Sequence, residues 1–369
     1  MEIFELLKNL SETPGPSGFE RQVAEVIQDS WKPLVDEIDL DKVGSLVAIK
    51  KGQGAEPRSR ILLAAHMDEI GLMVKQLLSL DGSEDGSGFL RVTGVGGVDL
   101  RHLYGQTVVV HSSAGTDLVG ILGSLPAWKL PENKRNKPYD FENLAVDTGK
   151  SFGELKKLVS VGDFVSFRQP LRKLLNKRAA GKALDNRTSV ASITICLEKL
   201  SHRSHDWDVI AVATAQEETR YLGAFTSAYA LIPDVAIAID VTFGKGPGAT
   251  DDRTFELGDG PTLGLGPNFH PGVHKALNEA AEALEMKVHT EPDAGSGGTD
   301  AFGLQIARSG IPTGLVSIPL RYMHTMVESV ALADVERVGR LLAEFVVRLD
   351  ENFLDNITGE MIDTKDGKK

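Results

Sequence analysis

Apolar residues recur at helical spacing in two segments near the start of the chain. Residues 3–10 and 23–31 carry them three or four positions apart, which is the spacing of one face of an α-helix. Between these segments, residues 13–18 read Thr-Pro-Gly-Pro-Ser-Gly, a sequence that interrupts helices. We therefore predict two helices joined by a tight loop.

Short apolar runs follow, separated by helical patterns. Residues 60–65 read RILLAA, and residues 209–215, 235–240 and 313–318 are similarly apolar at nearly every position. Runs of this kind are typical of strands in a sheet that helices cover on both faces. The helical periodicity of segments such as 188–200 and 332–349 supplies that cover. We predict an α/β fold with a three-layer α/β/α domain.

The pattern changes in the middle of the chain. Residues 75–170 contain short strand-like pieces between Gly, Ser and Asp clusters, with one candidate helix at 152–158. This pattern predicts a small β-domain, inserted into an α/β domain formed by residues 1–74 and 171–369. We expect it to make subunit contacts rather than to supply metal ligands. The Lys-rich tail after Ile362 is expected to be mobile.

Composition and charge exclude several function classes. The 369 residues include 52 Asp and Glu against 40 Lys and Arg, a net charge of −12, which disfavours binding to nucleic acid or to an anionic membrane. No apolar run approaches the ~20 residues of a membrane-spanning helix. Acidic residues interrupt the apolar start of the chain, unlike a signal peptide, and Cys196 is the single cysteine. We predict a cytoplasmic protein.

Ionisable residues stand where the apolar runs end. The carboxyl ends of parallel strands meet at one edge of an α/β sheet, where ligands bind, so we expect these side chains to converge. Each taken alone also fits a turn, a helix cap or a structural histidine. The convergent residues are His66, Glu217, Glu218, Asp240 and His324, with Asp185 at the start of a helix.

These residues offer nitrogen and oxygen ligands without cysteine, a set that suits zinc, and also cobalt or manganese. We hypothesise two divalent ions bridged by Asp185, one held by His66 and Asp240 and the other by Glu218 and His324. Two ions held in this way are expected ~3.5–4 Å apart and would share a water molecule whose pKa they lower.

The remaining carboxylates have candidate roles in the same reaction. Neighbouring side chains of a strand point to opposite sides, so Glu217 would not share the direction of Glu218 and is free to act as general base. A helix N-terminal residue stabilised by the dipole is the alternative for Glu217. Asp68, two residues after His66, would hydrogen-bond the second ring nitrogen of that histidine.

Several segments resemble one known family. They read AHMDEIGLMV (65–74), GKALDNR (181–187), QEE (216–218), AIDVT (238–242), GSGGTDA (295–301) and IPLRYMHTMVES (318–329). In this order they are similar to the metallo-aminopeptidase family of the tetrahedral aminopeptidases, whose members have also been labelled glutamyl or deblocking aminopeptidases and endoglucanases. The resemblance covers nearly the whole chain.

The resemblance implies the same five metal ligands, with Glu217 as general base and Asp68 as the partner of His66. It also implies hydrolysis of the peptide bond at a free N-terminus, dimer contacts through the inserted β-domain, and a homo-oligomer, a tetrahedral dodecamer built from dimers. Related two-metal peptidases have a cis peptide after the bridging aspartate, so we expect one between Asp185 and Asn186.

Two other functions remain as alternatives. An endoglucanase would use two carboxyl groups on either side of the scissile bond, which leaves both histidines and Asp185 without a role. A non-catalytic assembly protein on the same scaffold would normally have lost a ligand, whereas all five ligand positions are filled here.

Overall fold

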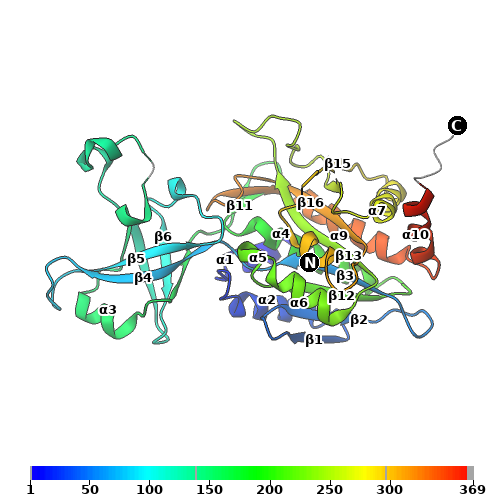
Figure 1. Cartoon of the computed structure of the whole chain (residues 1–369), viewed down its shortest axis with the longest axis horizontal. Helices are drawn as coiled ribbons and strands as arrows, with labels where there is room; N and C mark the ends of the chain where they lie inside the picture. Colours follow the sequence, from blue (N-terminus) through cyan, green and yellow to red (C-terminus); the bar gives the residue numbers. More distant parts are fainter. Residues whose placement is uncertain (1, 138, 296, 364–369) are drawn as a thin grey trace.

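A computed structural model describes residues 2–137, 139–295 and 297–363 of the chain. Figure 1 shows an elongated molecule in which a small β-domain projects from a larger α/β domain. Beyond residue 363, the tail that we expect to be mobile lies outside the described residues.

The larger domain is built on a mixed sheet. Its strands are β1 (Glu37–Leu40), β2 (Leu46–Lys50), β3 (Arg60–His66), β10 (Arg172–Leu174), β11 (Arg178–Gly181), β12 (Asp208–Thr214), β13 (Val235–Phe243), β14 (Thr262–Leu265), β15 (His289–Pro292), β16 (Thr313–Arg321) and β17 (Glu328–Ala331). The strand order is β1-β2-β12-β3-β13-β16-β17-β11-β10, and β14 pairs with β15 and β16. At the centre, β12, β3, β13 and β16 are parallel.

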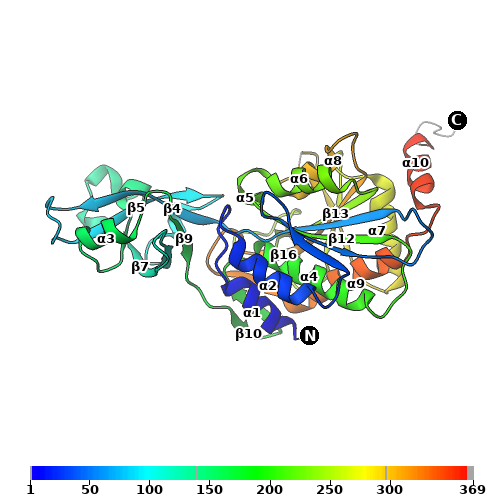
Figure 2. The ribbon, with the colours of Figure 1, turned by 90° about the horizontal axis from the view of Figure 1, so that it is seen from below.

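Helices cover both faces of this sheet. On one face lie α1 (Ile3–Glu12), α2 (Arg21–Trp31), α4 (Leu184–Leu200), α7 (Pro271–Ala283), α9 (Leu332–Val347) and α10 (Phe353–Asp363), and on the other lie α6 (Leu222–Leu231) and α8 (Asp300–Gln305). Figure 2 shows the three layers. Side chains alternate between the faces: Ile61 and Leu63 join one hydrophobic cluster, and Leu62 and Ala64 join another. The predicted three-layer α/β/α fold is confirmed.

The inserted β-domain is a closed barrel. Its strands are β4 (Gly71–Ser79), β5 (Gly88–Val95), β6 (Thr107–His111), β7 (Asp117–Gly123), β8 (Ala145–Asp147) and β9 (Phe164–Phe167), closed in the order β4-β5-β8-β7-β6-β9. The expected helix is α3 (Phe152–Leu158), which starts with a capping box between Ser151 and Glu154. A small β-domain inserted in the α/β chain is thus confirmed.

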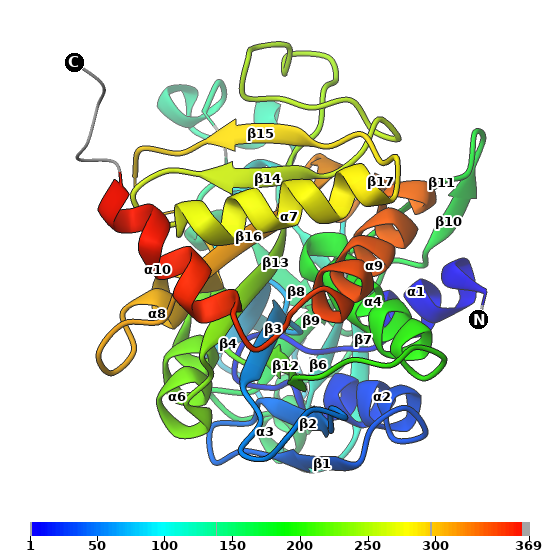
Figure 3. The ribbon, with the colours of Figure 1, turned by 90° about the vertical axis from the view of Figure 1, so that its right-hand side faces the viewer.

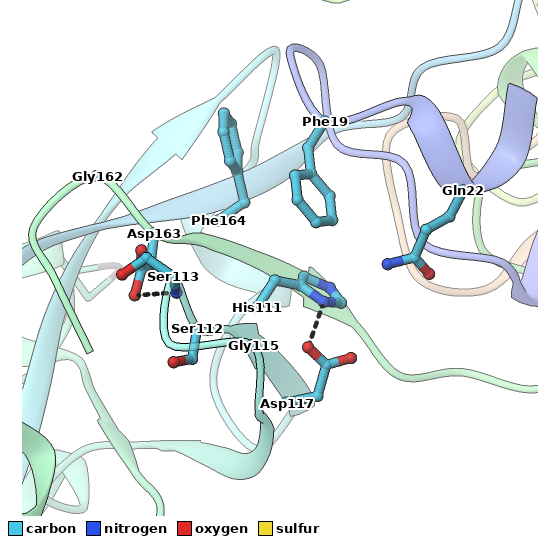
Figure 4. Close-up of a pocket in the computed structure, with 10 residues that line it drawn as sticks. All are labelled: Phe19, Gln22, His111, Ser112, Ser113, Gly115, Asp117, Gly162, Asp163 and Phe164. Atoms are coloured by element: carbon cyan, nitrogen blue, oxygen red, sulfur yellow. Dashed lines mark hydrogen bonds and ion pairs between the residues drawn. The ribbon is translucent and has the colours of Figure 1, made fainter. Parts of the chain in front are cut away.

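An aromatic contact fastens the barrel to the α/β domain. Phe19, between α1 and α2, stacks on His111 of β6 with ring centroids 4.9 Å apart, and on Phe164 of β9 at 5.5 Å. Figure 4 shows these rings at a pocket of about 520 Å³, where His111 is paired with Asp117. The two domains are therefore joined by side-chain packing as well as by the chain connections.

The C-terminal part departs from the sequence expectation, which ended the last helix at residue 349. The structure has a further helix, α10, which crosses the end of α7 (Figure 3). Ile357 of α10 is buried, and a Cβ atom on Gly272 of α7 would lie 2.7 Å from its Cβ atom. This packing joins residues that are far apart in the sequence, so the local pattern of residues 353–363 does not predict it. Within the described ranges, no helix combines the length and apolar content that crossing a membrane requires.

A close helix contact in the core gives a stability prediction. A Cβ atom on Gly339 of α9 would lie 2.6 Å from the Cβ atom of Ile195 in α4. We expect Gly339→Ala to force α4 and α9 apart and to lower the free energy of unfolding by ~1–3 kcal/mol, the usual cost of overpacking a core. Thermal unfolding of the variant measures this change. The exposed Glu336→Ala on the same helix is the control, and a Gly339→Ala protein as stable as wild type would contradict the prediction.

Candidate metal centre

The ionisable residues singled out in the sequence gather at one edge of the central sheet. His66 is the last residue of β3, Asp240 lies in β13, and His324 follows β16. Asp185 is in the first turn of α4, and Glu217 and Glu218 open the short helix α5 (Glu217–Arg220). Parallel strand order brings these distant segments together, as expected for an α/β sheet.

A first group consists of His66, Asp185 and Asp240, all buried. The Nε2 atom of His66 lies 3.2 Å from Oδ1 of Asp185 and 3.9 Å from Oδ1 of Asp240. The ligand atoms of the three residues lie within 4.8 Å of one another. This spacing fits three ligands directed at one ion.

A second group consists of Asp185, Glu218 and His324. The Nε2 atom of His324 lies 3.4 Å from Oδ2 of Asp185 and 3.8 Å from Oε1 of Glu218. Asp185 therefore turns one carboxylate oxygen to each group. In the described part of the chain, these are the groups of His, Cys, Asp or Glu with spacing suited to a metal ion.

The backbone before α4 directs Asp185 into the site. Ala183 has a left-handed conformation with φ 54°, and Asp185 and Asn186 depart from helical torsion angles. The Asp185–Asn186 peptide is cis, as expected. The Asn186 side-chain nitrogen donates a hydrogen bond to the Ile239 carbonyl, 2.8 Å away, which ties this turn to β13 just before Asp240.

The two neighbouring glutamates lie in a turn rather than in an extended strand. β12 ends at Thr214, and Gln216 is left-handed with φ 59°, so strand alternation does not describe their directions. The Glu217 side chain turns to the first group, with Oε2 3.7 Å from Nε2 of His66, whereas Glu218 belongs to the second. The side chains thus diverge because of this turn.

Asp68 stabilises that turn by accepting two backbone hydrogen bonds. Its Oδ1 accepts a hydrogen bond from the Glu217 backbone N–H at 3.0 Å, and its Oδ2 accepts one from Glu218 at 3.1 Å. Toward His66, the Nδ1 atom lies 3.2 Å from the Asp68 carbonyl oxygen and 3.5 Å from its carboxylate. The buried carboxylate therefore contacts the histidine less closely than it contacts the two amides.

The centre has an excess of negative charge. Burial raises the pKa of Glu217 and of Asp240 well above the usual range, and burial together with Asp185 raises the pKa of Glu218 to about 7. Hydrogen bonding to Asp185 raises the pKa of His324 to about 9. Desolvation and mutual repulsion of carboxylates cause the upward shifts of the three carboxyl pKa values, so the side chains alone do not balance their own charge.

A divalent cation would supply the missing positive charge. Imidazole and carboxylate donors are ligands that zinc, cobalt and manganese accept, and the spacing within each group is close enough for a shared ion. The residues therefore fit divalent metal ions, and a bound cation would favour the ionised form of these carboxylates.

The sequence analysis missed Glu328, which holds two of these segments in place. Its buried carboxylate accepts the backbone N–H of Asp185 at 3.0 Å and that of His324 at 2.9 Å. Glu328 lies four residues after His324 inside the segment IPLRYMHTMVES. The sequence signal that could have identified Glu328 was a carboxylate at the start of a buried strand, β17, because a buried carboxylate requires hydrogen-bond partners.

Comparisons with known proteins identify the family of this chain. Residues 44–341 match the model of the M42 glutamyl aminopeptidase family. The chain is 34% identical to the lysyl aminopeptidase of Pyrococcus furiosus over 342 residues, which cover 92% of this chain and 95% of that protein.

Solved structures of similar proteins have the same fold. A TET aminopeptidase from a marine sediment archaeon of the Thaumarchaeota matches with a TM-score of 0.88 at 31% identity, over 96% of this chain and 99% of that one. The TET1 peptidase of Pyrococcus horikoshii, which can assemble into a tetrahedron or a large octahedral shell, matches with a TM-score of 0.81 at 30% identity, over 94% and 100% of the chains. The family model and the relatives cover most of the chain, and the chain belongs to the M42 glutamyl aminopeptidase family.

Proposed function

We propose that this enzyme, a hydrolase of an aminopeptidase family, uses two divalent metal ions to remove N-terminal residues from peptides. One observation carries the proposal: two ligand groups share the two oxygens of a single buried carboxylate, Asp185. Family membership supports peptide hydrolysis over the endoglucanase and non-catalytic alternatives.

His66 and Asp240 would hold one ion, Glu218 and His324 the other, and Asp185 both. Zinc is the metal that we favour for this donor set, with cobalt and manganese as alternatives. When bound, such ions act as Lewis acids on the peptide carbonyl and lower the pKa of the attacking water.

Glu217 is our candidate general base. Its carboxylate is buried beside His66 of the first ligand group, and burial raises its pKa well above that of an exposed glutamate. A carboxylate in this environment can accept a proton from the attacking water at an Oε atom and deliver it to the leaving amine. Asp68, which contacts the backbone N–H groups of Glu217 and Glu218, would position the base and one ligand together.

The family supports our proposals for the substrate class and the assembly. Peptides with a free N-terminus are the proposed substrates, and the protein is proposed to be a homo-oligomer, a tetrahedral dodecamer built from dimers. Val119 and Ile121 support barrel-mediated contacts, because both lie half-exposed on the outer face of β7. The cytoplasmic location stays a prediction.

Metal removal tests the reaction class. Purified enzyme should release amino acids from a panel of aminoacyl chromogenic substrates, lose this activity after treatment with a chelator, and regain it with zinc or cobalt. Plasma emission should find two divalent ions per chain in the active form. The same preparations are assayed on a soluble cellulose derivative. Polysaccharide cleavage without aminoacyl hydrolysis would support the endoglucanase alternative, and turnover unaffected by chelation would contradict the metal mechanism.

Matched substitutions separate the two glutamates. Glu217→Gln keeps the side-chain size but removes the basic oxygen, so we expect both metals to remain while kcat falls at least ~10²-fold, as for loss of a general base. Glu218→Gln should instead weaken one metal position, and added metal should restore part of its activity. Metal content and turnover are measured for both variants. The assignment is wrong if Glu217→Gln loses metal and Glu218→Gln keeps it.

Charge on the outer face of β7 tests the assembly. The double variant Val119→Glu/Ile121→Glu should lower the molar mass in light scattering, because buried unpaired carboxylates oppose a subunit interface. The control is Leu174→Glu/Leu175→Glu, which places the same two charges on the exposed hairpin of β10 and β11. A reduced mass for the control together with an unchanged mass for the double variant would contradict barrel-mediated contacts.

A further inference from the structure

A turn of the inserted barrel lies directly against the second ligand group. Residues 96–97 follow strand β5, and the carbonyl oxygen of Gly97 lies 3.1 Å from Nδ1 of His324. With Nδ1 donating to this carbonyl, the Nε2 atom is left as the lone-pair nitrogen on the side of Asp185, 3.4 Å away. A hydrogen bond of this kind fixes both the tautomer and the orientation of a ligating imidazole.

This approach requires glycine at both positions. A Cβ atom on Gly97 would lie 2.5 Å from Nδ1 and 2.7 Å from Cε1 of His324. A Cβ atom on Gly96, where φ is +78°, would lie 3.1 Å from Oε2 of Glu218. The barrel backbone thus contacts His324 and passes close to Glu218, at distances that leave no space for a side chain at residue 97 and little at residue 96.

The segment that carries His324 is also anchored in the barrel. Met326, two residues further along, is buried in the hydrophobic cluster that forms the barrel core, together with Ile70 and Leu72. Val98, next to Gly97, packs against the same cluster. The glycine turn and the His324 segment are therefore held by a common apolar core.

The first group is supported differently. His66 places its Nδ1 atom 3.2 Å from the carbonyl oxygen of Asp68, which belongs to the α/β domain. The histidine of one group is thus oriented from the α/β domain, and the histidine of the other from the barrel.

We propose that the inserted barrel is a structural part of the second metal position, with Gly97 as a positioning residue for His324. The inference rests on the proposed two-metal function and adds to it a role for the barrel beyond subunit contacts. It makes occupancy of this position depend on how the barrel is seated, whereas occupancy of the first position depends on the α/β domain.

Cobalt titration of the metal-free enzyme, followed by visible absorption and calorimetry, tests this proposal. In Gly97→Ala, one cobalt equivalent should bind about 10- to 100-fold more weakly, the usual loss when the partner of a ligating histidine is changed. The other equivalent should bind as in wild type. Gly123→Ala is the control in the same barrel, since among the described residues, its two chain neighbours aside, no atom lies within 4 Å of the added Cβ atom. Asp185→Ala should weaken both equivalents.

A second pair of variants tests the proposal if Gly97→Ala does not fold. Met326→Ala removes the anchor of the His324 segment and should weaken the same cobalt equivalent, while Met326→Leu, which keeps the apolar volume, should restore it. General loss of stability would not single out one equivalent or be rescued in this way. Two equivalents bound with wild-type affinity by Gly97→Ala, or by Met326→Ala if Gly97→Ala does not fold, overturn the inference.

A failure of the proposed two-metal function can be distinguished from a failure of this inference. If wild type binds one ion per chain, the two-metal mechanism is wrong, and the role of the barrel is judged on a crystal structure of the metal-free Gly97→Ala enzyme. A His324 ring displaced from residue 97 supports positioning by the barrel, and an unmoved ring overturns it.

Discussion

The site depends on one buried ion pair that joins segments from three parts of the chain. Lys182 donates to both oxygens of Glu69 at 2.8 and 2.7 Å, and all of these groups are buried. Glu69 also accepts the N–H of Gly15, and Arg187 donates to the Met67 carbonyl. Removing Glu69 would leave the buried cations of Lys182 and Arg187 without their carboxylate, at a cost of ~3–5 kcal/mol. The pair therefore fixes the end of β3, which bears His66, relative to the start of α4, which bears Asp185.

Buried carboxylates around the candidate metal centre accept hydrogen bonds from backbone N–H groups. Asp68 and Glu328 each accept two backbone N–H groups, and Glu20 accepts those of Gly18 and Gln216. The bonds to the Asp185 and Glu217 amides are buried, and each satisfies a donor that would otherwise cost about 1–3 kcal/mol. Asp185, Glu218 and His324 consequently lie on turns whose shape is set by acidic side chains that do not themselves belong to either ligand group.

The sequence predicts the parts that local patterns encode. The strands ending at His66 and near Asp240 follow from continuous apolar runs, and the donor types follow from residue identity. Local patterns do not predict the turn at Gln216, the backbone hydrogen bonds of Glu328 or the contact of Gly97 with His324. Each of these features depends on a partner far away in the chain. Helix α10 was missed for the same reason, since its burial depends on α7.

The place of the insertion explains why the barrel meets the centre. The chain leaves the sheet just after His66, rejoins it at β10, and reaches Asp185 after the β10–β11 hairpin. The insertion therefore lies in the sequence between two residues of the first ligand group. Domains are inserted where the two ends of the host lie close together, and here that point is also the edge where α/β sheets bind ligands. A domain inserted there lies beside the centre from the outset, and two glycines bring its backbone within reach of His324.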